Sequence, residues 1–269
     1  NKHGIKPRFI ASHGHTIFHQ PNEHFTYQIG SGACIAAETG ITTIADFRSL
    51  DVALQGQGAP LVPIGDELLF HQYDYCLNLG GFANISARLN EQRIAYDICP
   101  VNIVLNTFTR KIGLEYDAGG VMARSGSCNQ NLLQELNALP YYKQSIPKSL
   151  GKEWVLSECM PVINKYDIDL IDILHTFSHH VAIQLSAHVA QGKSVLVTGG
   201  GTYNSFIIDL FKSYSNANII IPDDFTIQFK EALIFAFLGL LRLEGNNNAL
   251  RSVTGARIDN IGGCVYAMK

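Results

Sequence analysis

The residue of this chain best suited to proton transfer is Asp97, within residues 95–102 (AYDICPVN). It stands at the end of an expected strand, shortly before Pro100, which suits the first turn of a helix. A carboxylate at a strand end that faces a helix start can take a proton from an attacking water or hydroxyl. The same side chain could instead cap the helix through its oxygen, and both roles could hold at once.

A second candidate for chemistry is a pair of glycines within residues 77–86 (LNLGGFANIS). Gly80 and Gly81 break an apolar strand, which then resumes with Asn84. Because glycine has no Cβ, backbone N–H groups can approach an anion closely, and this turn could cradle phosphate oxygens. A Gly-Gly hairpin bend that binds no ligand would have the same sequence.

A third candidate is the glycine run within residues 195–204 (VLVTGGGTYN). Gly199, Gly200 and Gly201 follow an expected buried strand and precede a helix that starts near Asn204. Such a turn places backbone donors and the positive end of a helix at one point, which suits a nucleotide phosphate or a flat base. The run lacks the register of a dinucleotide-binding fold and the Lys-Ser/Thr of a P-loop, and a tight strand-to-helix turn is the alternative.

Arg48 lies in a polar, Gly-rich stretch that follows a strand, within residues 44–63 (IADFRSLDVALQGQGAPLVP). Its planar guanidinium could bind a carboxylate or a phosphate through two parallel hydrogen bonds. A surface loop with an Asp–Arg pair would look similar.

Two groups of histidines resemble metal sites without meeting their requirements. No Cys or carboxylate lies at metal-ligand spacing from His13, His15 and His19, so binding or packing roles are expected of them. His175 and His179 have helical i, i+4 spacing, but no Glu lies between them in the HExxH sense, which argues against zinc hydrolysis.

The composition is that of an ordinary globular protein that acts on small molecules. The 269 residues are 46% hydrophobic and 16% charged, with a net charge of -3 and no run of five like charges. Neither nucleic acid nor a membrane is therefore expected as a partner. No signal-peptide pattern occurs, which predicts a cytoplasmic location. Six cysteines, without a CxxC pair, are expected as free thiols in core segments: Cys34, Cys76, Cys99, Cys128, Cys159 and Cys264.

Short β-branched and aromatic runs alternate with longer segments of helical period, which is typical of an α/β fold with crossover helices. Three strands close together in residues 74–98 predict an antiparallel meander. Residues 140–153 predict a loop long enough to be functional. Strands are expected at 8–12, 25–29, 41–45, 74–79, 83–89, 93–98, 194–198 and 218–221, and helices at 31–39, 100–112, 129–138, 168–191, 204–214 and 228–243.

Taken in order along the chain, these motifs resemble the anhydro-N-acetylmuramic acid kinases, sugar kinases of the actin, hexokinase and Hsp70 superfamily. The resemblance covers nearly the whole chain, and its most specific parts are FRS and GQGAPLVP. It runs through residues 12–15 (SHGH), 28–30 (QIG), 45–48 (ADFR), 56–63 (GQGAPLVP), 78–81 (NLGG), 147–149 (PKS), 198–201 (TGGG) and 231–232 (EA).

The resemblance implies a two-lobed actin-like ATPase (ribonuclease H-like) fold of the α/β class with a central cleft. Residues 1–73 and the returning segment 228–269 would form the first lobe, and residues 74–227 the second. The implied reaction uses ATP and water to open the 1,6-anhydro ring of anhydro-N-acetylmuramic acid and to phosphorylate O6. Its product is N-acetylmuramic acid 6-phosphate, for peptidoglycan recycling. Mg²⁺ on the phosphates is expected, as is a homodimer.

The resemblance also assigns roles to residues of this chain. Asp97 falls at the family's catalytic aspartate, the general base that activates water. The remaining assignments are the second phosphate loop at Gly80, Gly81 and Asn84, the adenosine motif at Gly199, Gly200, Gly201 and Asn204, and sugar contacts at His13, Arg48, Asn102 and Glu231.

The chain departs from the family pattern in two places. The family's leading strand, with its Gly-Thr-Ser-x-Asp-Gly phosphate loop, is absent from these residues, so the chain is expected to lack a leading segment. After Asp97, where the family usually has Thr-Gly-Pro-Gly-Asn, residues 98–102 read ICPVN.

Two other functions are compatible with the same residues. The first is a truncated, non-catalytic sugar-binding relative of these kinases. The second is a glycosidase that pairs Asp97 with Asp46, Asp51 or Glu231, although this reading leaves the TGGG motif unexplained.

Overall fold

The computed structural model describes residues 4 and 6–268, which divide into two compact units. The first unit contains the described residues up to His71, the segment Leu89–Ile94, and the chain from Phe229 onward. The second contains Gln72–Arg88 and Ala95–Gln228. Both units combine strands and helices, so the predicted α/β class is confirmed. The predicted lobes differ from these units chiefly at residues 89–94, the tip of a hairpin, which cluster with the first unit.

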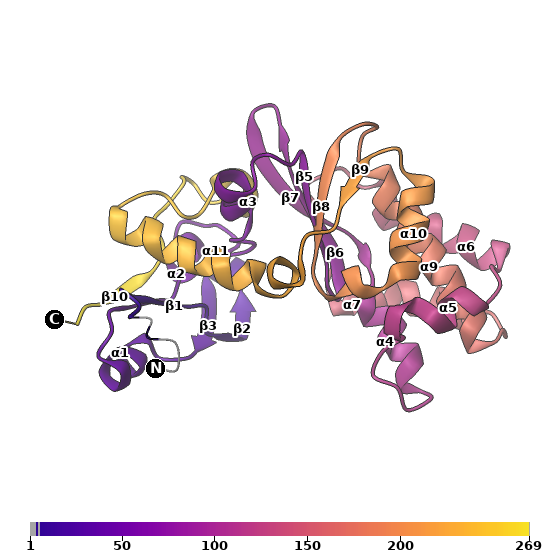
Figure 1. Ribbon diagram of the computed structural model, residues 1–269, viewed down its shortest axis with the longest axis horizontal. Helices are drawn as coiled ribbons and strands as arrows, with labels where there is room; N and C mark the ends of the chain where they lie inside the picture. Colours follow the sequence, from indigo (N-terminus) through magenta and orange to yellow (C-terminus); the bar gives the residue numbers. More distant parts are fainter. Residues whose placement is uncertain (1–3, 5, 269) are drawn as a thin grey trace. The chain divides into compact units, whose positions relative to one another are not determined.

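The first unit is built on a small mixed sheet (Figure 1). Its central strand β4 (Thr43–Ala45) pairs in parallel with β1 (Ile10–Ser12) and antiparallel with β10 (Cys264–Tyr266). A separate hairpin joins β2 (His15–Gln20) to β3 (Phe25–Ile29). The helices of this unit are α1 (Gly32–Thr39), α2 (Ser49–Ala53), α3 (Pro63–Leu69), α12 (Arg251–Thr254) and most of α11 (Asp224–Glu244).

The core of the first unit is formed by α11 together with β4, α3 and the residues between them. On α11, Ile234, Leu238 and Leu241 recur at helical spacing and are buried. They pack against Ile44 on β4 and Ile64 on α3. This apolar stripe explains why α11, from the C-terminal part of the chain, packs with the N-terminal strands.

The second unit is built on a five-stranded sheet in the order β7-β6-β5-β8-β9. Strand β5 (Tyr75–Leu79) pairs antiparallel with β6 (Phe82–Leu89) and in parallel with β8 (Ser194–Thr198), which pairs in parallel with β9 (Asn218–Ile220). The antiparallel β5–β6 pair confirms the start of the predicted meander. Strand β7 (Gln92–Pro100) follows β6 after a tight turn at Asn90 and Glu91, both with positive φ, as two-residue hairpins require.

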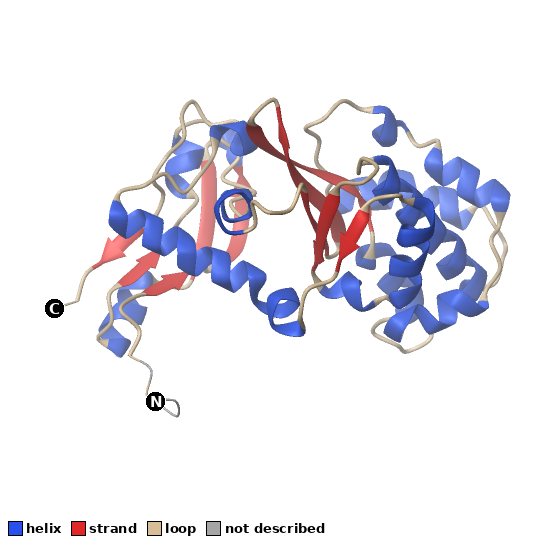
Figure 2. Ribbon diagram, turned by 45° about the horizontal axis from the view of Figure 1, so that its top comes forward, coloured by secondary structure: helices blue, strands red, loops and turns tan. Residues whose placement is uncertain are grey.

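Helices of the second unit gather beside this sheet in both ribbon views (Figures 1 and 2). Helix α9 (Leu170–Ala187) is central, because α5 (Val121–Ser125), α6 (Gln130–Asn137) and α10 (Ser205–Tyr214) all pack on it. Phe177, Leu174 and Leu185 of α9 are fully buried. The other helices of this unit are α4 (Asn102–Arg110), α7 (Lys152–Trp154), a π-helical turn at Val155–Cys159, and α8 (Met160–Asn164). Three short 3₁₀ helices lie at Ala118–Gly120, Pro140–Lys143 and Gly200–Tyr203.

Several sequence predictions require correction. Pro100 does not start a helix; it is the last residue of β7, and α4 begins at Asn102. The predicted helix 168–191 is shorter, ending at Ala187. Cys34 and Cys264 are exposed rather than in the core, although all six cysteines are free as expected. Strands β2 and β10 and the short helices α2, α3, α5, α7, α8 and α12 were not predicted, because they are short or lack regular apolar alternation.

No helix of the described residues is long and apolar enough to cross a membrane.

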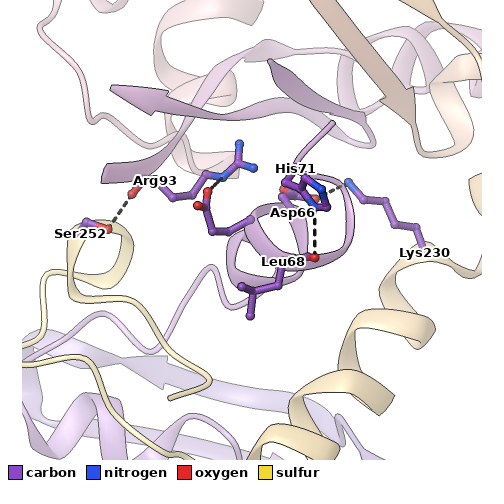
Figure 3. Close-up of polar contacts among 7 residues, drawn as sticks. Asp66, Leu68, His71, Arg93, Lys230 and Ser252 are labelled. Carbon is purple, nitrogen blue, oxygen red and sulfur yellow. Dashed lines mark hydrogen bonds and ion pairs between the residues drawn. The ribbon is translucent and has the colours of Figure 1, made fainter. Parts of the chain in front are cut away.

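Two buried ion pairs tie separate segments of the first unit together (Figure 3). Lys230 Nζ on α11 lies 2.6 Å from Asp66 Oδ1 on α3. Next to it, Arg93 Nε in the hairpin tip donates to Glu67 Oε2 at 3.0 Å, and the Arg93 carbonyl accepts from the Ser252 hydroxyl at 2.6 Å. These bonds explain why residues 89–94 cluster with the first unit.

We expect Asp66→Asn to destabilise the protein by about 3–5 kcal/mol, because it leaves the buried Lys230 ammonium without its carboxylate. The exposed pair Lys165–Glu135 is the matched control, and Lys165→Gln should cost less than about 1 kcal/mol. Chemical unfolding followed by circular dichroism measures both. Equal losses in the two variants would contradict this account.

Candidate active site

The two glycine turns of the sequence lie against each other at one edge of the second unit's sheet. Strands β5 and β8 run in parallel, with Asn78 opposite Thr198, so the turns after them leave the sheet side by side. A Cβ added to Gly199 would lie 2.5 Å from Asn78 Oδ1 and 2.7 Å from the Leu79 carbonyl oxygen. Gly199 also has a φ of 87°, in the region that favours glycine. The contact between the turns therefore requires glycine at this position.

The start of α4 fixes the Gly80–Gly81 turn. The Val101 amide donates to the Gly81 carbonyl at 2.8 Å, and the Asn102 amide donates to the Gly80 carbonyl at 3.3 Å. The structure therefore brings Asn102 next to the first glycine pair. These N–H groups of α4 hold the turn in place, so they are not the donors of a phosphate site.

The second glycine turn leaves open space where a ligand could approach. A Cβ added to Gly200 would meet no atom within 4 Å. Nearby, the Thr202 hydroxyl is buried and has no hydrogen-bond partner within the described part of the chain. A buried hydroxyl of this kind is costly unless something bonds it. Thr202 was not singled out from the sequence, because an unsatisfied hydroxyl has no sequence signal.

The two asparagines expected at the nucleotide differ in their surroundings. Asn204 Oδ1 accepts from the Ile207 amide at 3.1 Å, so this side chain caps the start of α10. Asn84 lies on β6 opposite Asn78 and is exposed. Asn204 therefore caps the helix that follows the glycine run, whereas Asn84 lies on a strand with an exposed side chain.

Asp97 lies on β7 and is held by the loop that was predicted at residues 140–153. Its amide donates to the Lys148 carbonyl at 2.9 Å, and its own carbonyl accepts from the Tyr141 hydroxyl at 2.6 Å. Its carboxylate oxygen Oδ2 accepts from the Leu150 amide at 2.9 Å. The alternative in which Asp97 caps α4 is therefore wrong, because the strand continues for three residues beyond it and the helix starts at Asn102.

The surroundings of Asp97 make it a better base than an exposed carboxylate. Burial raises its pKa, and the hydrogen bond from the Leu150 amide opposes that shift only in part. The loop itself is fixed by Lys148, whose Nζ donates to the Tyr141 carbonyl at 3.1 Å and lies 4.4 Å from the centre of the Tyr141 ring. Burial lowers the pKa of Lys148. Tyr141 and Leu150 were not predicted as site residues, since their contacts with Asp97 span more than 40 residues.

Arg48 and His13 come together in the first unit. Arg48 Nη1 donates to the Gly58 carbonyl at 2.6 Å, and Nη2 lies 2.7 Å from His13 Nε2. A guanidinium can only donate, so His13 Nε2 accepts and its Nδ1–H donates to the Gly14 carbonyl at 2.8 Å. Among the described residues Arg48 Nε is buried and has no partner, which leaves its N–H to be satisfied.

Glu231 on α11 is close enough to act on Arg48 electrostatically. Burial lowers the pKa of Arg48, and the carboxylate of Glu231 opposes this shift. Glu231 is itself exposed. The structure therefore brings together three of the predicted sugar contacts, His13, Arg48 and Glu231, while Asn102 lies in the second unit.

The other carboxylates considered for a glycosidase have structural roles. Asp51 is fully buried; Oδ1 accepts from the Thr254 hydroxyl and the Asn260 amide group, and Oδ2 from the Gly58 amide, each at 2.8 Å. Asp46 Oδ1 accepts from the amide and hydroxyl of Ser49 at the start of α2. Neither carboxylate is available to pair with Asp97 in catalysis.

The structure describes no group of three or more His, Cys, Asp or Glu side chains that could hold a metal ion, counting residues 4 and 6–268. His13 binds Arg48 and packs edge-on against the Phe235 ring, with 4.5 Å between ring centres.

We expect Gly199→Ala to disturb the contact between the turns. It should lower the free energy of unfolding by more than Gly192→Ala, which has a similar φ of 73° and open space, and so costs only about 1–2 kcal/mol of backbone strain. Thermal unfolding measures the difference. Losses of the same size would contradict the contact between the turns.

The glycine at position 200 allows a complementary test. Because its Cβ position is open, Gly200→Ala should leave the stability of the free protein unchanged. If the nucleotide expected from the sequence approaches there, ATP binding measured by calorimetry should weaken at least about tenfold. An unchanged ATP affinity would count against this assignment.

Comparison with known proteins places the chain in one family. It matches the family model described as anhydro-N-acetylmuramic acid kinase over residues 3–268. It is 35% identical to the enzyme of that name from Vibrio cholerae, over 96% of this chain and 75% of the relative, and 35% identical to that from Pasteurella multocida, over 98% and 76%. Among solved structures, the activator of the 2-hydroxyisocaproyl-CoA dehydratase from Clostridium difficile with bound ADPNP is 17% identical, with a TM-score of 0.40. That match covers 71% of this chain and 64% of the activator, and it carries no argument about the site. The extent and identity of the sequence matches show that the chain belongs to the anhydro-N-acetylmuramic acid kinase family.

Proposed function

We propose that this protein converts 1,6-anhydro-N-acetylmuramic acid, ATP and water into N-acetylmuramic acid 6-phosphate and ADP, in peptidoglycan recycling. The observation that carries this proposal is the family match over residues 3–268. The half-buried, hydrogen-bonded position of Asp97 and the paired glycine turns support it.

Asp97 acts as the general base in this proposal. Its carboxylate takes a proton from a water molecule, whose oxygen bonds to C1 of the sugar as the C1–O6 bond breaks. The released O6 bonds to the γ-phosphorus of ATP as the bond to the ADP oxygen breaks. A raised pKa makes Asp97 a stronger proton acceptor. Three hydrogen bonds with the 141–150 loop, one of them to the carboxylate, keep the residue in position.

The nucleotide is assigned to the glycine turns of the second unit. Gly80, Gly81 and Asn84 would lie at the phosphates, and Gly199, Gly200, Gly201 and Asn204 at the adenosine. The open space at Gly200 supports contact with a flat base, and the capping bond of Asn204 supports a fixed turn.

The sugar is assigned to His13, Arg48, Asn102 and Glu231. The acetylmuramic sugar carries a carboxylate on its lactyl group, and the remaining donor of Arg48 suits an acidic oxygen. Glu231 would accept from sugar hydroxyl groups, since an exposed carboxylate is an acceptor only.

The wider setting follows from family membership. We propose an actin-like ATPase fold with functional lobes of residues 1–73 with 228–269, and 74–227, a cytoplasmic location and a homodimer. Six free thiols support the cytoplasmic location.

We propose Mg²⁺ as the bound cation, which neutralises charge on the phosphates during transfer. The described side chains offer no cluster of three metal ligands, so they fit an ion held mainly by ATP oxygens and water.

Asp97→Asn should lower kcat by about 10²- to 10⁴-fold, because the amide cannot take the proton from water. The amide oxygen can still accept from Leu150, so folding and ATP binding should be retained. Formation of the 6-phosphate by the complete gene product measures the effect. Asp167→Asn, at an exposed carboxylate, is the control and should change nothing.

The pH profile offers an independent check on the same residue. The ionised form of Asp97 is the base, so activity should be lost as pH falls through its raised pKa. The acid limb of the pH profile should therefore lie at higher pH than for an ordinary Asp.

A wild-type protein that binds the sugar but does not consume ATP would instead support a non-catalytic sugar-binding relative.

Arg48→Lys should raise KM for the sugar at least about tenfold while leaving KM for ATP unchanged. The single ammonium nitrogen of lysine cannot take the positions of the three guanidinium nitrogens, two of which contact the Gly58 carbonyl and His13. Arg257→Lys, at an exposed arginine of the same unit, is the matched control. A rise in KM for ATP but not for the sugar would reassign Arg48 to the nucleotide.

A further inference from the structure

A pair of histidines on α9 lies outside the residues assigned to the kinase reaction. His175 and His179 are one helical turn apart, so their side chains project from the same face of α9. Their Nε2 atoms lie 3.0 Å from each other. Both side chains are half-buried, so the nitrogens remain reachable from solvent.

The other nitrogen of each ring is held by a neighbouring element. His175 Nδ1 lies 2.8 Å from the Ala123 carbonyl on α5, and a carbonyl only accepts, so Nδ1 carries the proton and Nε2 has a lone pair. His179 Nδ1 lies 2.6 Å from the Tyr214 hydroxyl on α10. A partner on the second nitrogen is the usual support of a metal-binding histidine, because it fixes the ring and its tautomer.

The two Nε2 atoms are joined by a hydrogen bond. Because His175 Nε2 has the lone pair, His179 Nε2–H donates to it, and His179 Nδ1 accepts from the Tyr214 hydroxyl. The two Nε2 atoms therefore share one proton, and a metal ion bound between them would take its place.

The spacing of the nitrogens favours particular ions. With metal–nitrogen distances of about 2.05 Å, a separation of 3.0 Å corresponds to an angle of about 94° at the metal. This is close to the 90° between neighbouring ligands in tetragonal or octahedral geometry, and narrower than the tetrahedral angle. Cu²⁺ and Ni²⁺ prefer tetragonal sites with nitrogen ligands. Turning both lone pairs to one point needs only rotation about χ2, which is a soft torsion for His.

We propose that His175 and His179 form a bidentate site for a late divalent transition metal, with Ni²⁺ or Cu²⁺ bound between their Nε2 atoms. Within the described residues no third His, Cys, Asp or Glu completes a cluster, so water fills the remaining positions. Because no Glu lies between the histidines, the site has no general base of the HExxH kind and acts in binding rather than hydrolysis.

Calorimetric titration with Ni²⁺ in a non-chelating buffer tests the proposal. The wild-type chain should bind one equivalent, and His175→Gln and His179→Gln should each weaken that binding at least about tenfold. His71→Gln, at an exposed histidine of the first unit, is the matched control and should leave the affinity unchanged.

A second variant guards against loss of folding in the histidine variants. Tyr214→Phe removes the hydroxyl that bonds the outer nitrogen of His179 and keeps the ring that packs on His179, so it should weaken Ni²⁺ binding by less than either glutamine variant. Electron paramagnetic resonance with Cu²⁺ should show coupling to two ring nitrogens in the wild type and to one in each glutamine variant. Absence of Ni²⁺ binding, or equal affinity in the wild type and both glutamine variants, would overturn the proposal.

Discussion

The parallel pairing of β5 with β8 is the constraint on which the two glycine turns depend. It makes two turns, more than 100 residues apart in the chain, leave the sheet at the same edge. The turns then approach so closely that a Cβ on Gly199 would overlap the side chain of Asn78 and the backbone of Leu79. Glycine at position 199 is therefore needed for packing. The nucleotide contact that we propose for this turn would depend on the same lack of a side chain.

Asp97 depends on this sheet in a different way. It lies two strands from β5, on β7, and the strand continues past it to Pro100. Its local hydrogen bonds come from the 141–150 loop, which contributes an amide, a carbonyl and a hydroxyl. The strand fixes the position of the residue, and the loop orients its carboxylate. Burial raises the pKa of Asp97, and the hydrogen bond from the loop opposes that shift only in part.

Much of the architecture could be predicted from the sequence, because apolar periodicity reports directly on burial. The expected strands 25–29 and 194–198 coincide with β3 and β8, and the antiparallel turn at Gly80–Gly81 was recognised. What could not be predicted are contacts between distant residues. Pro100 suits a helix start by its own conformation, yet pairing in the sheet retains it in β7. Likewise, nothing near Asp97 in the sequence indicates Tyr141 or Leu150.

The acidic residues of the chain show why residue type alone does not identify a site. Asp51 and Asp97 were both considered for catalysis. Three donors surround the Asp51 carboxylate in the core of the first unit, where it joins α2 to the C-terminal segment through Thr254 and Asn260. These hydrogen bonds give Asp51 a structural role. Asp97 is half-buried, its carboxylate accepts from the Leu150 amide, and burial raises its pKa. The surroundings of each carboxylate, which depend on the folded chain, separate the structural aspartate from the candidate base.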